Sequence, residues 1–396
     1  YIYINMTECR FIDNYCEGAR GGALYFNPSA PILIERCYFS GNCAQGETQE
    51  GHCIYLSTRA NGIIQDCEFV DNYPYTPESE EYKFTSGYSQ VHLHSSRSIT
   101  ISRCAFRRSQ ANLTSRGIDI DYPGSISIIN STFSDLDTSD LHGACIHYNT
   151  TDRSIFDDDI EVYGCIFSNN DAANGCTLYL NLSNSPTIRK NTIMNHRSGH
   201  HIFSIFYNSF LDSSTITECT FRNCSTIYED GGGSGIWIAN EEFISNGRPA
   251  DLIFEKCIWE NNEAYDRGGA LHYGKSKTLV GVSLTFDLCQ FIRNRAYNCG
   301  GALSLITKSP ISIHRCTFTS NEVISNSTGD ITHGASIFIN SSTPYVGISL
   351  CTFNNETADD GNAIFITRSV QTCYISDCIF ENCARNQLKE GTIVIS

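Results

Sequence analysis

The sequence is short of basic residues and has no long hydrophobic run, and each shortage excludes a class of protein. Lys and Arg number 27 against 43 Asp and Glu, which gives a formal net charge of -16. This acidity argues against nucleic acid or an anionic membrane as the main partner. No apolar stretch is long enough to span a membrane, and the sequence shows no signal peptide.

The 20 cysteines include no C-x-x-C pair, although such pairs are typical of structural zinc sites. We therefore expect no cysteine-bound metal and no cofactor. The number of cysteines, together with nine N-x-S/T sequons, instead predicts an extracellular or cell-surface location. The candidate glycosylation sites are Asn5, Asn112, Asn130, Asn149, Asn181, Asn223, Asn326, Asn340 and Asn355.

The most prominent feature present is a repeated unit. Cys289–Leu305, Cys257–Tyr273 and Cys9–Phe26 each contain a C-x-F segment, a turn Asn, a Gly-Gly pair and a second short apolar segment. Self-similarity at a period near 30 residues predicts a solenoid. Because each coil of a solenoid contacts only its neighbours, residues 1–396 can form a single body without splitting into domains. Both ends lie within a strand pattern, so we expect a fragment of a longer chain.

Thirteen units can be aligned on the first residue of the C-x-F segment, which we call the anchor. An apolar residue precedes each anchor by three positions, an aromatic residue or Ile follows by two, and a third apolar segment follows the glycines. Alternation within each segment indicates strands, and the break in alternation at the anchor indicates a bend. The anchors are Cys9, Cys37, Cys67, Cys104, Ser131, Cys165, Asn191, Cys219, Cys257, Cys289, Cys316, Cys351 and Cys378.

This pattern predicts an all-β protein, a parallel β-helix of about 13 coils with three short strands per coil. Right-handedness is the strong default for parallel crossovers. An Asn ladder is expected at one turn, because stacked amides bond along the axis and to turn backbone. Its members are Asn14, Asn42, Asn72, Asn170, Asn262, Asn294 and Asn321.

Eleven of the anchors are cysteines that should face inward. Parallel strands hold their Cβ vectors parallel, which leaves neighbouring Cβ atoms too far apart for an undistorted disulfide. A ladder of buried thiols is therefore expected, with Cys acting as a small hydrophobic residue. Cys16 and Cys43 follow the turn Asn in adjacent coils, and they are the best candidates for a disulfide.

The motif C-x-F-x-x-N followed by G-G-A-[IL] resembles the FxxN and GGA[ILV] repeats of the polymorphic outer-membrane protein (Pmp) family, over nearly the whole chain. Similar repeats occur in surface proteins of parasitic protists. The resemblance implies a surface adhesin whose partner is a host or neighbouring-cell surface protein or glycan. The best matches are Phe11/Asn14 with Gly21–Leu24, Phe291/Asn294 with Gly300–Leu303 and Trp259/Asn262 with Gly268–Leu271; Ser109, Cys224 and Cys383 break the pattern.

One residue of the third strand in each coil should point outward, between two inward residues. Aromatic residues are frequent at these positions, and Tyr179, Phe203 and Trp237 are expected in successive coils. A row of exposed rings suits sugar rings or an apolar partner surface. The alternative is that the rings only stack on one another or are covered by loops.

His92, Asp119 and His147 are expected in the same outward row, in three consecutive coils, with His94 and Asp121 beside them. Two His and two Asp at strand spacing could hold a divalent metal or act as acid and base. The alternative is a polar interruption of an exposed ladder.

Three functions fit these observations. The first is a cell-surface adhesion or interaction rod without catalysis. The second is a polysaccharide-active hydrolase or lyase, based on the β-helix and the Asp/His cluster. The third is a structural subunit of an extracellular filament or coat that assembles with itself. We expect no enzymatic activity, because glycoside hydrolysis needs a pair of nearby carboxylates and the repeat accounts for those present.

Overall fold

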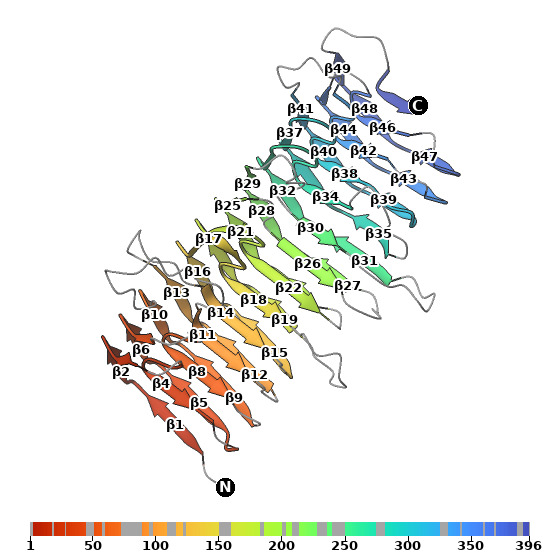
Figure 1. Cartoon of the computed structure of the whole chain (residues 1–396). Helices are drawn as coiled ribbons and strands as arrows, with labels where there is room; N and C mark the ends of the chain where they lie inside the picture. The colour runs from red at the N-terminus through yellow and green to blue at the C-terminus, as the bar shows by residue number, and fades with distance from the viewer. Residues whose placement is uncertain are drawn as a thin grey trace. The chain divides into compact units, whose positions relative to one another are not determined.

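The structure is a computed structural model of the 396-residue chain. It describes residues 3–17, 20–27, 29–44, 51–57, 60–72, 89–94, 98–108, 116–121, 124–149, 160–182, 186–199, 203–207, 214–227, 236–239, 250–274, 282–324, 332–340, 343–358, 361–367, 370–385 and 391–395. Within these ranges every regular element is a β-strand, and the strands pair in parallel (Figure 1). The all-β parallel β-helix is thereby confirmed.

The chain forms two compact units, unit 1 (Tyr1–Thr187) and unit 2 (Ile188–Ser396). In unit 1 the first sheet contains β1 (Ile4–Thr7), β5 (Ile32–Glu35), β9 (Asn61–Gln65), β12 (Ser98–Ser102), β15 (Ser125–Ile129) and β19 (Ile160–Tyr163). The second contains β2 (Arg10–Ile12), β6 (Tyr38–Ser40), β10 (Glu68–Val70), β13 (Ala105–Arg107), β16 (Thr132–Ser134) and β20 (Ile166–Ser168). The third contains β4 (Leu24–Phe26), β8 (Ile54–Ser57), β11 (Ser89–His94), β14 (Arg116–Asp121), β18 (Ile146–Asn149) and β22 (Leu178–Leu182).

Unit 2 repeats these three sheets. The first contains β23 (Thr187–Arg189), β27 (Ser214–Thr217), β31 (Ala250–Glu255), β35 (Val282–Asp287), β39 (Ile311–His314), β43 (Val346–Ser349) and β47 (Cys373–Ser376). The second contains β24 (Thr192–Met194), β28 (Thr220–Arg222), β32 (Ile258–Glu260), β36 (Gln290–Ile292), β40 (Thr317–Thr319), β44 (Thr352–Asn354) and β48 (Ile379–Glu381). The third contains β26 (Phe203–Tyr207), β30 (Ile236–Ala239), β34 (Leu271–Tyr273), β38 (Leu303–Leu305), β42 (Ile337–Ile339), β46 (Ile364–Ile366) and β50 (Ile393–Ile395).

A short fourth strand follows the turn position in many coils, whether or not that position is Asn, and adds to the three strands predicted. In unit 1 these strands are β3 (Tyr15–Cys16) with β7 (Cys43–Ala44), and β17 (Asp137–His142) with β21 (Asp171–Asn174). In unit 2 they are β25 (Arg197–Ser198), β29 (Ser225–Thr226), β33 (Glu263–Ala264), β37 (Arg295–Ala296), β41 (Glu322–Val323), β45 (Thr357–Ala358) and β49 (Ala384–Arg385).

A residue with positive φ separates the first and second strands of a coil. It lies directly before the anchor, as at Arg36 (φ 51°), Asp66 (φ 55°) and Leu288 (φ 54°). This left-handed conformation turns the chain sharply within one residue and resets the alternation of side chains. It is the physical reason for the break in alternation at the anchor.

Aromatic side chains two residues after the anchors form the core of each unit. In unit 1 the rings from Phe11 to Phe167 stack with centroids 4.7 to 5.0 Å apart. In unit 2 Trp259 stacks between Phe221 and Phe291, at 5.4 and 4.8 Å. These distances follow the spacing of hydrogen-bonded strands, so the register of the second sheet sets the packing of the core.

The predicted Asn ladder is present within each unit. In unit 2 Asn294 Nδ2 donates to Asn321 Oδ1 at 3.0 Å and to the Trp259 carbonyl at 3.0 Å. In unit 1 Asn42 Nδ2 donates to Asn72 Oδ1 at 2.8 Å. Glu356 occupies the same turn position one coil after Asn321, and its Oε1 lies 3.4 Å from Asn321 Nδ2. The ladder therefore provides hydrogen bonds to buried backbone groups of the turns, and it also includes one buried carboxyl group.

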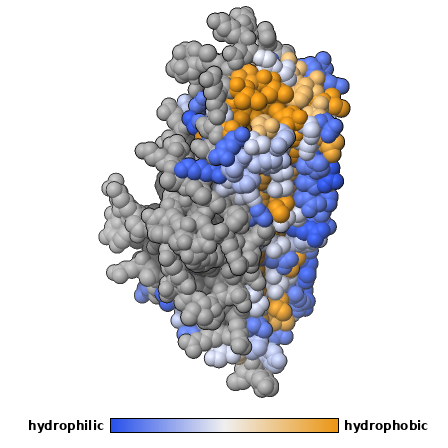
Figure 2. Space-filling view, turned by 90° about the vertical axis from the view of Figure 1, so that its right-hand side faces the viewer, coloured by the Kyte–Doolittle hydropathy of each residue, from blue (hydrophilic) through white to orange (hydrophobic). Residues whose placement is uncertain are grey.

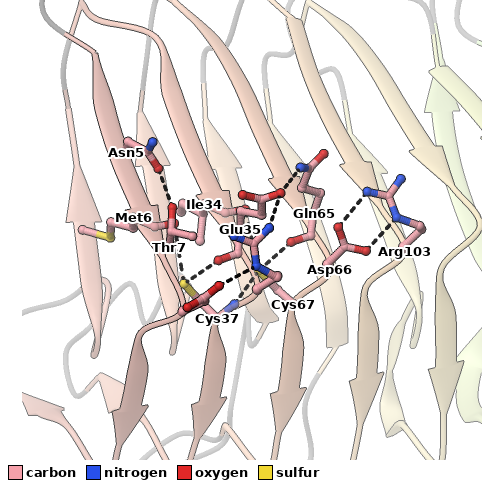
Figure 3. Close-up of polar contacts among 12 residues, drawn as sticks. Asn5, Met6, Thr7, Ile34, Glu35, Cys37, Gln65, Asp66, Cys67 and Arg103 are labelled. Atoms are coloured by element: carbon pink, nitrogen blue, oxygen red, sulfur yellow. Dashed lines mark hydrogen bonds and ion pairs between the residues drawn. The ribbon is translucent and has the colours of Figure 1, made fainter.

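The cysteines, all of which lie in the described ranges, form no disulfides, and the anchor thiols contact backbone carbonyls. Cys37 Sγ lies 3.3 Å from the Glu35 carbonyl oxygen and 3.7 Å from that of Met6 in the previous coil (Figure 3). The predicted pairing of Cys16 with Cys43 is wrong. Cys43 is opposite Tyr15, and Cys16 is opposite Ala44, so the two cysteines occupy strand positions of opposite parity.

Polar side chains on the surface also bond from coil to coil. The guanidinium of Arg103 makes two bonds, of 2.6 and 2.7 Å, to the carboxylate of Asp66, and Gln65 Nε2 donates to Glu35 at 2.7 Å (Figure 3). The Arg103–Asp66 pair is exposed, and such pairs contribute about 1 kcal/mol or less. These contacts join a side chain of one coil to a side chain of the next, but they contribute little to the stability of the fold.

Candidate functional site

The outward row of the third sheet in unit 1 has the predicted register. His92 is opposite Tyr55 on one side and Asp119 on the other, and Asp119 is opposite His147. The row is not an open surface, however. Tyr25 is 53% exposed, whereas Tyr55 and His92 are 1% exposed and Asp119 is 4% exposed. The sequence reveals the register of this row but not that its central residues are covered.

Asp119 is the centre of a buried polar cluster. Its Oδ1 lies 2.6 Å from His147 Nδ1, and its Oδ2 lies 3.4 Å from His92 Nδ1 and 3.5 Å from Arg116 Nη1. The ring of His92 stacks on Tyr55 with centroids 5.1 Å apart. The strands β11, β14 and β18 thus bring three polar groups, those of His92, Arg116 and His147, together around one carboxylate.

Electrostatics keep Asp119 ionised. Burial opposes its charge, yet the hydrogen bond from His147 and the positive charge of Arg116 hold the pKa of this carboxyl well below its usual range. Burial and the Arg116 charge lower the pKa of His147, despite the attraction of Asp119. His147 is therefore neutral near pH 7 and donates its Nδ1 proton to Asp119.

The predicted ligand set His92, Asp119 and His147 needs correction. His147 and Asp119 are joined by a direct hydrogen bond, and Asp119 is almost completely buried. Among the described residues, the group whose potential ligand atoms all lie within 4.8 Å of one another is His92, His94 and Asp121. His94 and Asp121 are opposite one another on β11 and β14 and lie at the open side of the cluster.

The predicted binding row Tyr179, Phe203 and Trp237 is wrong in its register. On β26, Phe203 is opposite Ile236, and it is Ser204 that is opposite Trp237. Ile236 is opposite the buried Leu271 in the next coil. The segment HIFSIFY contains two overlapping alternations, and the one that forms aligns Phe203 with Ile236 and Ile205 with Ile238. The side chains of Phe203 and Trp237 lie outside the described residues.

Unit 2 has a polar hollow of about 420 Å³ on the side of the turn between its second and fourth sheets. Four consecutive coils contribute side chains to it at equivalent positions. We call it the turn hollow; it is lined by Asn261, Asn262, Glu263, Arg293, Arg295, Ser320, Asn321, Glu322, Asn355 and Thr357. Hydrogen-bond donors and acceptors therefore recur along the helix axis at strand spacing, about 4.8 Å.

Charges of both signs alternate in the turn hollow. Arg295 Nε donates to Glu322 Oε1 at 2.6 Å, and Arg295 Nη1 lies 3.8 Å from Glu263 Oε2. Arg293 Nε donates to Asn261 Oδ1 at 2.7 Å and its Nη2 pairs with Glu260. Each carboxylate faces a guanidinium, so the hollow offers a preformed set of polar groups with little net charge.

The surface seen in Figure 2 is hydrophilic over most of its described area, with hydrophobic residues gathered near the end where β47 and β48 lie. Tyr374 on β47 and Ile379 on β48 are 62% and 54% exposed. The described part of the chain contains no helix that could cross a membrane.

Five of the predicted sequons are on the described surface. Asn5, Asn130, Asn223, Asn340 and Asn355 are exposed. Asn112 and Asn326, and the side chains of Asn149 and Asn181, lie outside the described residues. Glycosylation at these positions remains a prediction.

In each unit, parallel sheets stack around an apolar core, which defines a β-solenoid protein. A family model described as a right handed beta helix region matches residues 80–343, which are 264 of the 396 residues. The chain therefore belongs to the right-handed β-helix family. No curated protein and no solved structure matches it.

Sequence reasoning missed Arg116 and the turn hollow. Arg116 occupies the register position of Ser89 in the preceding coil, where the best repeats have the second glycine of their Gly-Gly pair. Gly or Ser occupies this position in several coils, although His52 occupies it in one, so an Arg there was a usable signal. The sequence contains no comparable signal for the turn hollow, because each of its residues is an ordinary polar turn residue when a single coil is considered.

Proposed function

We propose that this protein is a non-catalytic recognition scaffold of the cell surface, which binds a hydroxyl-rich glycan in the turn hollow of unit 2. This proposal rests on the composition of the turn hollow, where amides, hydroxyls, guanidinium groups and carboxylates from four coils repeat at regular spacing. Sugar hydroxyls both donate and accept hydrogen bonds, so a linear glycan can be bound coil by coil.

Three further observations support a surface role. The repeats resemble those of the Pmp family of surface adhesins. Five sequons lie on exposed residues, as expected of a glycoprotein. The net charge of -16 disfavours nucleic acid as a competing partner.

We propose that the protein is not catalytic because its carboxylates in these two sites are already engaged by neighbouring side chains. Asp119 is buried and engaged by His147 and Arg116, so it offers no free oxygen to a substrate. In the turn hollow, Glu263 accepts a hydrogen bond of 2.8 Å from Tyr297, and Glu322 is paired with Arg295. A glycosidase needs one protonated and one free carboxyl group facing the same bond.

The test is binding to an array of glycans by wild-type protein and by the double variant Arg293→Gln/Arg295→Gln. The double variant should lose at least tenfold in affinity, because two charged donors are removed from the hollow. The matched control is Arg315→Gln, which removes an exposed arginine of the same unit that pairs with Asp287 outside the hollow. If no glycan binds, or if the double variant and the control bind alike, the proposal is wrong.

The second candidate is a polysaccharide hydrolase or lyase, and the cluster of Arg116, Asp119 and His147 favours it. A β-helix presents such residues from adjacent coils, and His147 could move a proton. Assays for new reducing ends and for unsaturated products over common polysaccharides separate the two functions. Turnover that is lost in His147→Gln would establish the enzyme.

A further inference from the structure

The side chains of His92, His94 and Asp121 on unit 1 form a partly open group that belongs to neither function above. His92 and His94 lie two residues apart on β11, so their side chains share one face of the strand. Asp121 lies at the end of β14, opposite His94. Two neighbouring strands therefore direct two imidazoles and a carboxylate to one place.

The distances between the potential ligand atoms fit a metal site. His92 Nε2 and Asp121 Oδ2 are 3.6 Å apart, which is too long for a hydrogen bond. Bond lengths of about 2.0–2.1 Å place two ligands of a tetrahedral Zn²⁺ roughly 3.3 Å apart. All three potential ligand atoms lie within 4.8 Å of one another, so small side-chain rotations would complete the set.

The surroundings of His92 orient it as a ligand. Its ring stacks on Tyr55, which fixes the ring plane, and its Nδ1 faces Asp119 Oδ2 at 3.4 Å. A carboxylate on one nitrogen of an imidazole directs the other nitrogen to a metal and raises its basicity. With Nδ1 turned to Asp119, Nε2 is the nitrogen that faces Asp121.

The group also has an accessible side. His92 is buried, whereas His94 is only partly covered and the Asp121 side chain is 32% exposed. Metal ions can therefore enter from the side of His94 and Asp121. Three protein ligands leave a fourth tetrahedral position for water or for an atom of a partner molecule.

We propose that His92, His94 and Asp121 bind a divalent transition metal, with Zn²⁺ as the best fit, and that Asp119 positions His92. Imidazole with one carboxylate suits Zn²⁺ rather than Ca²⁺ or Mg²⁺, which prefer sets of oxygen ligands. The site is independent of glycan binding in the turn hollow, which belongs to unit 2.

The test is a titration of chelator-treated protein with Zn²⁺, followed by isothermal calorimetry and by metal analysis after gel filtration. Wild-type protein should bind one Zn²⁺ per chain and prefer it to Ca²⁺ and Mg²⁺ by more than 100-fold. His94→Ala and Asp121→Asn should each weaken binding at least tenfold. Both positions are partly exposed, so the fold should tolerate these substitutions.

Two control variants and the spectrum of the Co²⁺-loaded protein test whether the metal binds at the proposed ligands. Asp66→Asn removes an exposed carboxylate of the same unit, and His314→Ala removes a histidine bonded to Ser349 in unit 2. Both should bind Zn²⁺ as wild type does. Asp119→Asn, shown to be folded by circular dichroism, should keep one site with about 10- to 100-fold lower affinity. Co²⁺-loaded protein should show d–d bands without thiolate charge-transfer absorption.

The proposal is overturned if wild-type protein binds no Zn²⁺. It is also overturned if His94→Ala and Asp121→Asn bind as tightly as the two controls. Thiolate absorption in the Co²⁺ protein would assign the metal to the cysteines and would equally contradict the proposal.

Discussion

Glu356 offers a test of the ladder in unit 2, because it places a carboxyl group where the two preceding coils have Asn294 and Asn321. The side chain is fully buried and contacts Asn321 Nδ2 and the hydroxyl of Ser336. Burial raises the pKa of Glu356 from 4.5 to about 8, although the hydrogen bonds oppose this change. We therefore predict that Glu356→Gln stabilises the protein in a pH-dependent manner.

The sign and size of this stability change follow from proton linkage. Between pH 4.5 and 8 the folded protein holds a proton that the unfolded chain has released, so stability falls as pH rises through this window. At about 1.36 kcal/mol per pKa unit, the buried carboxyl group lowers the free energy of unfolding by about 3 kcal/mol at pH 7 and about 5 kcal/mol above pH 8. Gln does not titrate, and it retains an acceptor for Asn321 and gains an NH₂ group that can donate to Ser336.

The assay is urea unfolding of wild type and Glu356→Gln at pH 5, 7 and 9, followed by circular dichroism. The variant should be nearly as stable as wild type at pH 5, about 3 kcal/mol more stable at pH 7 and about 5 kcal/mol more stable at pH 9. Glu356→Asn, which continues the ladder, should show the same change of slope with pH. Stability differences that do not vary with pH would refute the buried position of this carboxyl group.

Three further predictions follow from the core. Phe291→Ala should cost about 3–5 kcal/mol, because the ring is fully buried between Trp259 and Phe318; an unchanged urea midpoint would contradict its place in the stack. Burial raises the pKa of Cys165 to about 12, so iodoacetamide should label Cys165 only on unfolding, as mass spectrometry of tryptic peptides can check. Burial lowers the pKa of His52 to about 3, so its contribution to stability should be lost as pH falls from 6.5 towards 3. His52→Gln should reduce this acid sensitivity in urea unfolding, and an identical acid profile would contradict the burial of the imidazole.

The core was predictable from the sequence because stacking makes each core position recur. Phe291, Phe318 and Phe353 keep the same distance from their anchors, so the repeat reveals their common face. The conformation that joins the strands was not predictable. The left-handed residue before the anchor is Arg36 in one coil, Leu288 in another and Gly164 in a third, so no single residue type marks the bend.

Register was predictable where only one alternation fits. His92, Asp119 and His147 were correctly aligned, because each is flanked by two apolar residues. Around Phe203 two alternations overlap, and the predicted alternation, with Ile202 and Ser204 inward, is not the one that forms. The covering of Asp119 and the shape of the turn hollow depend on residues from several coils, which periodicity within one coil does not describe.

The central claim is that the turn hollow binds a glycan without altering it. The most direct measurement is an isothermal titration of the best array ligand into wild-type protein, with the ligand then recovered and its mass determined. The account predicts saturable binding, recovery of the ligand at its original mass, and loss of the binding heat when Arg293 and Arg295 are both changed to Gln. Shortened or unsaturated products, or unchanged binding by the double variant, would contradict it.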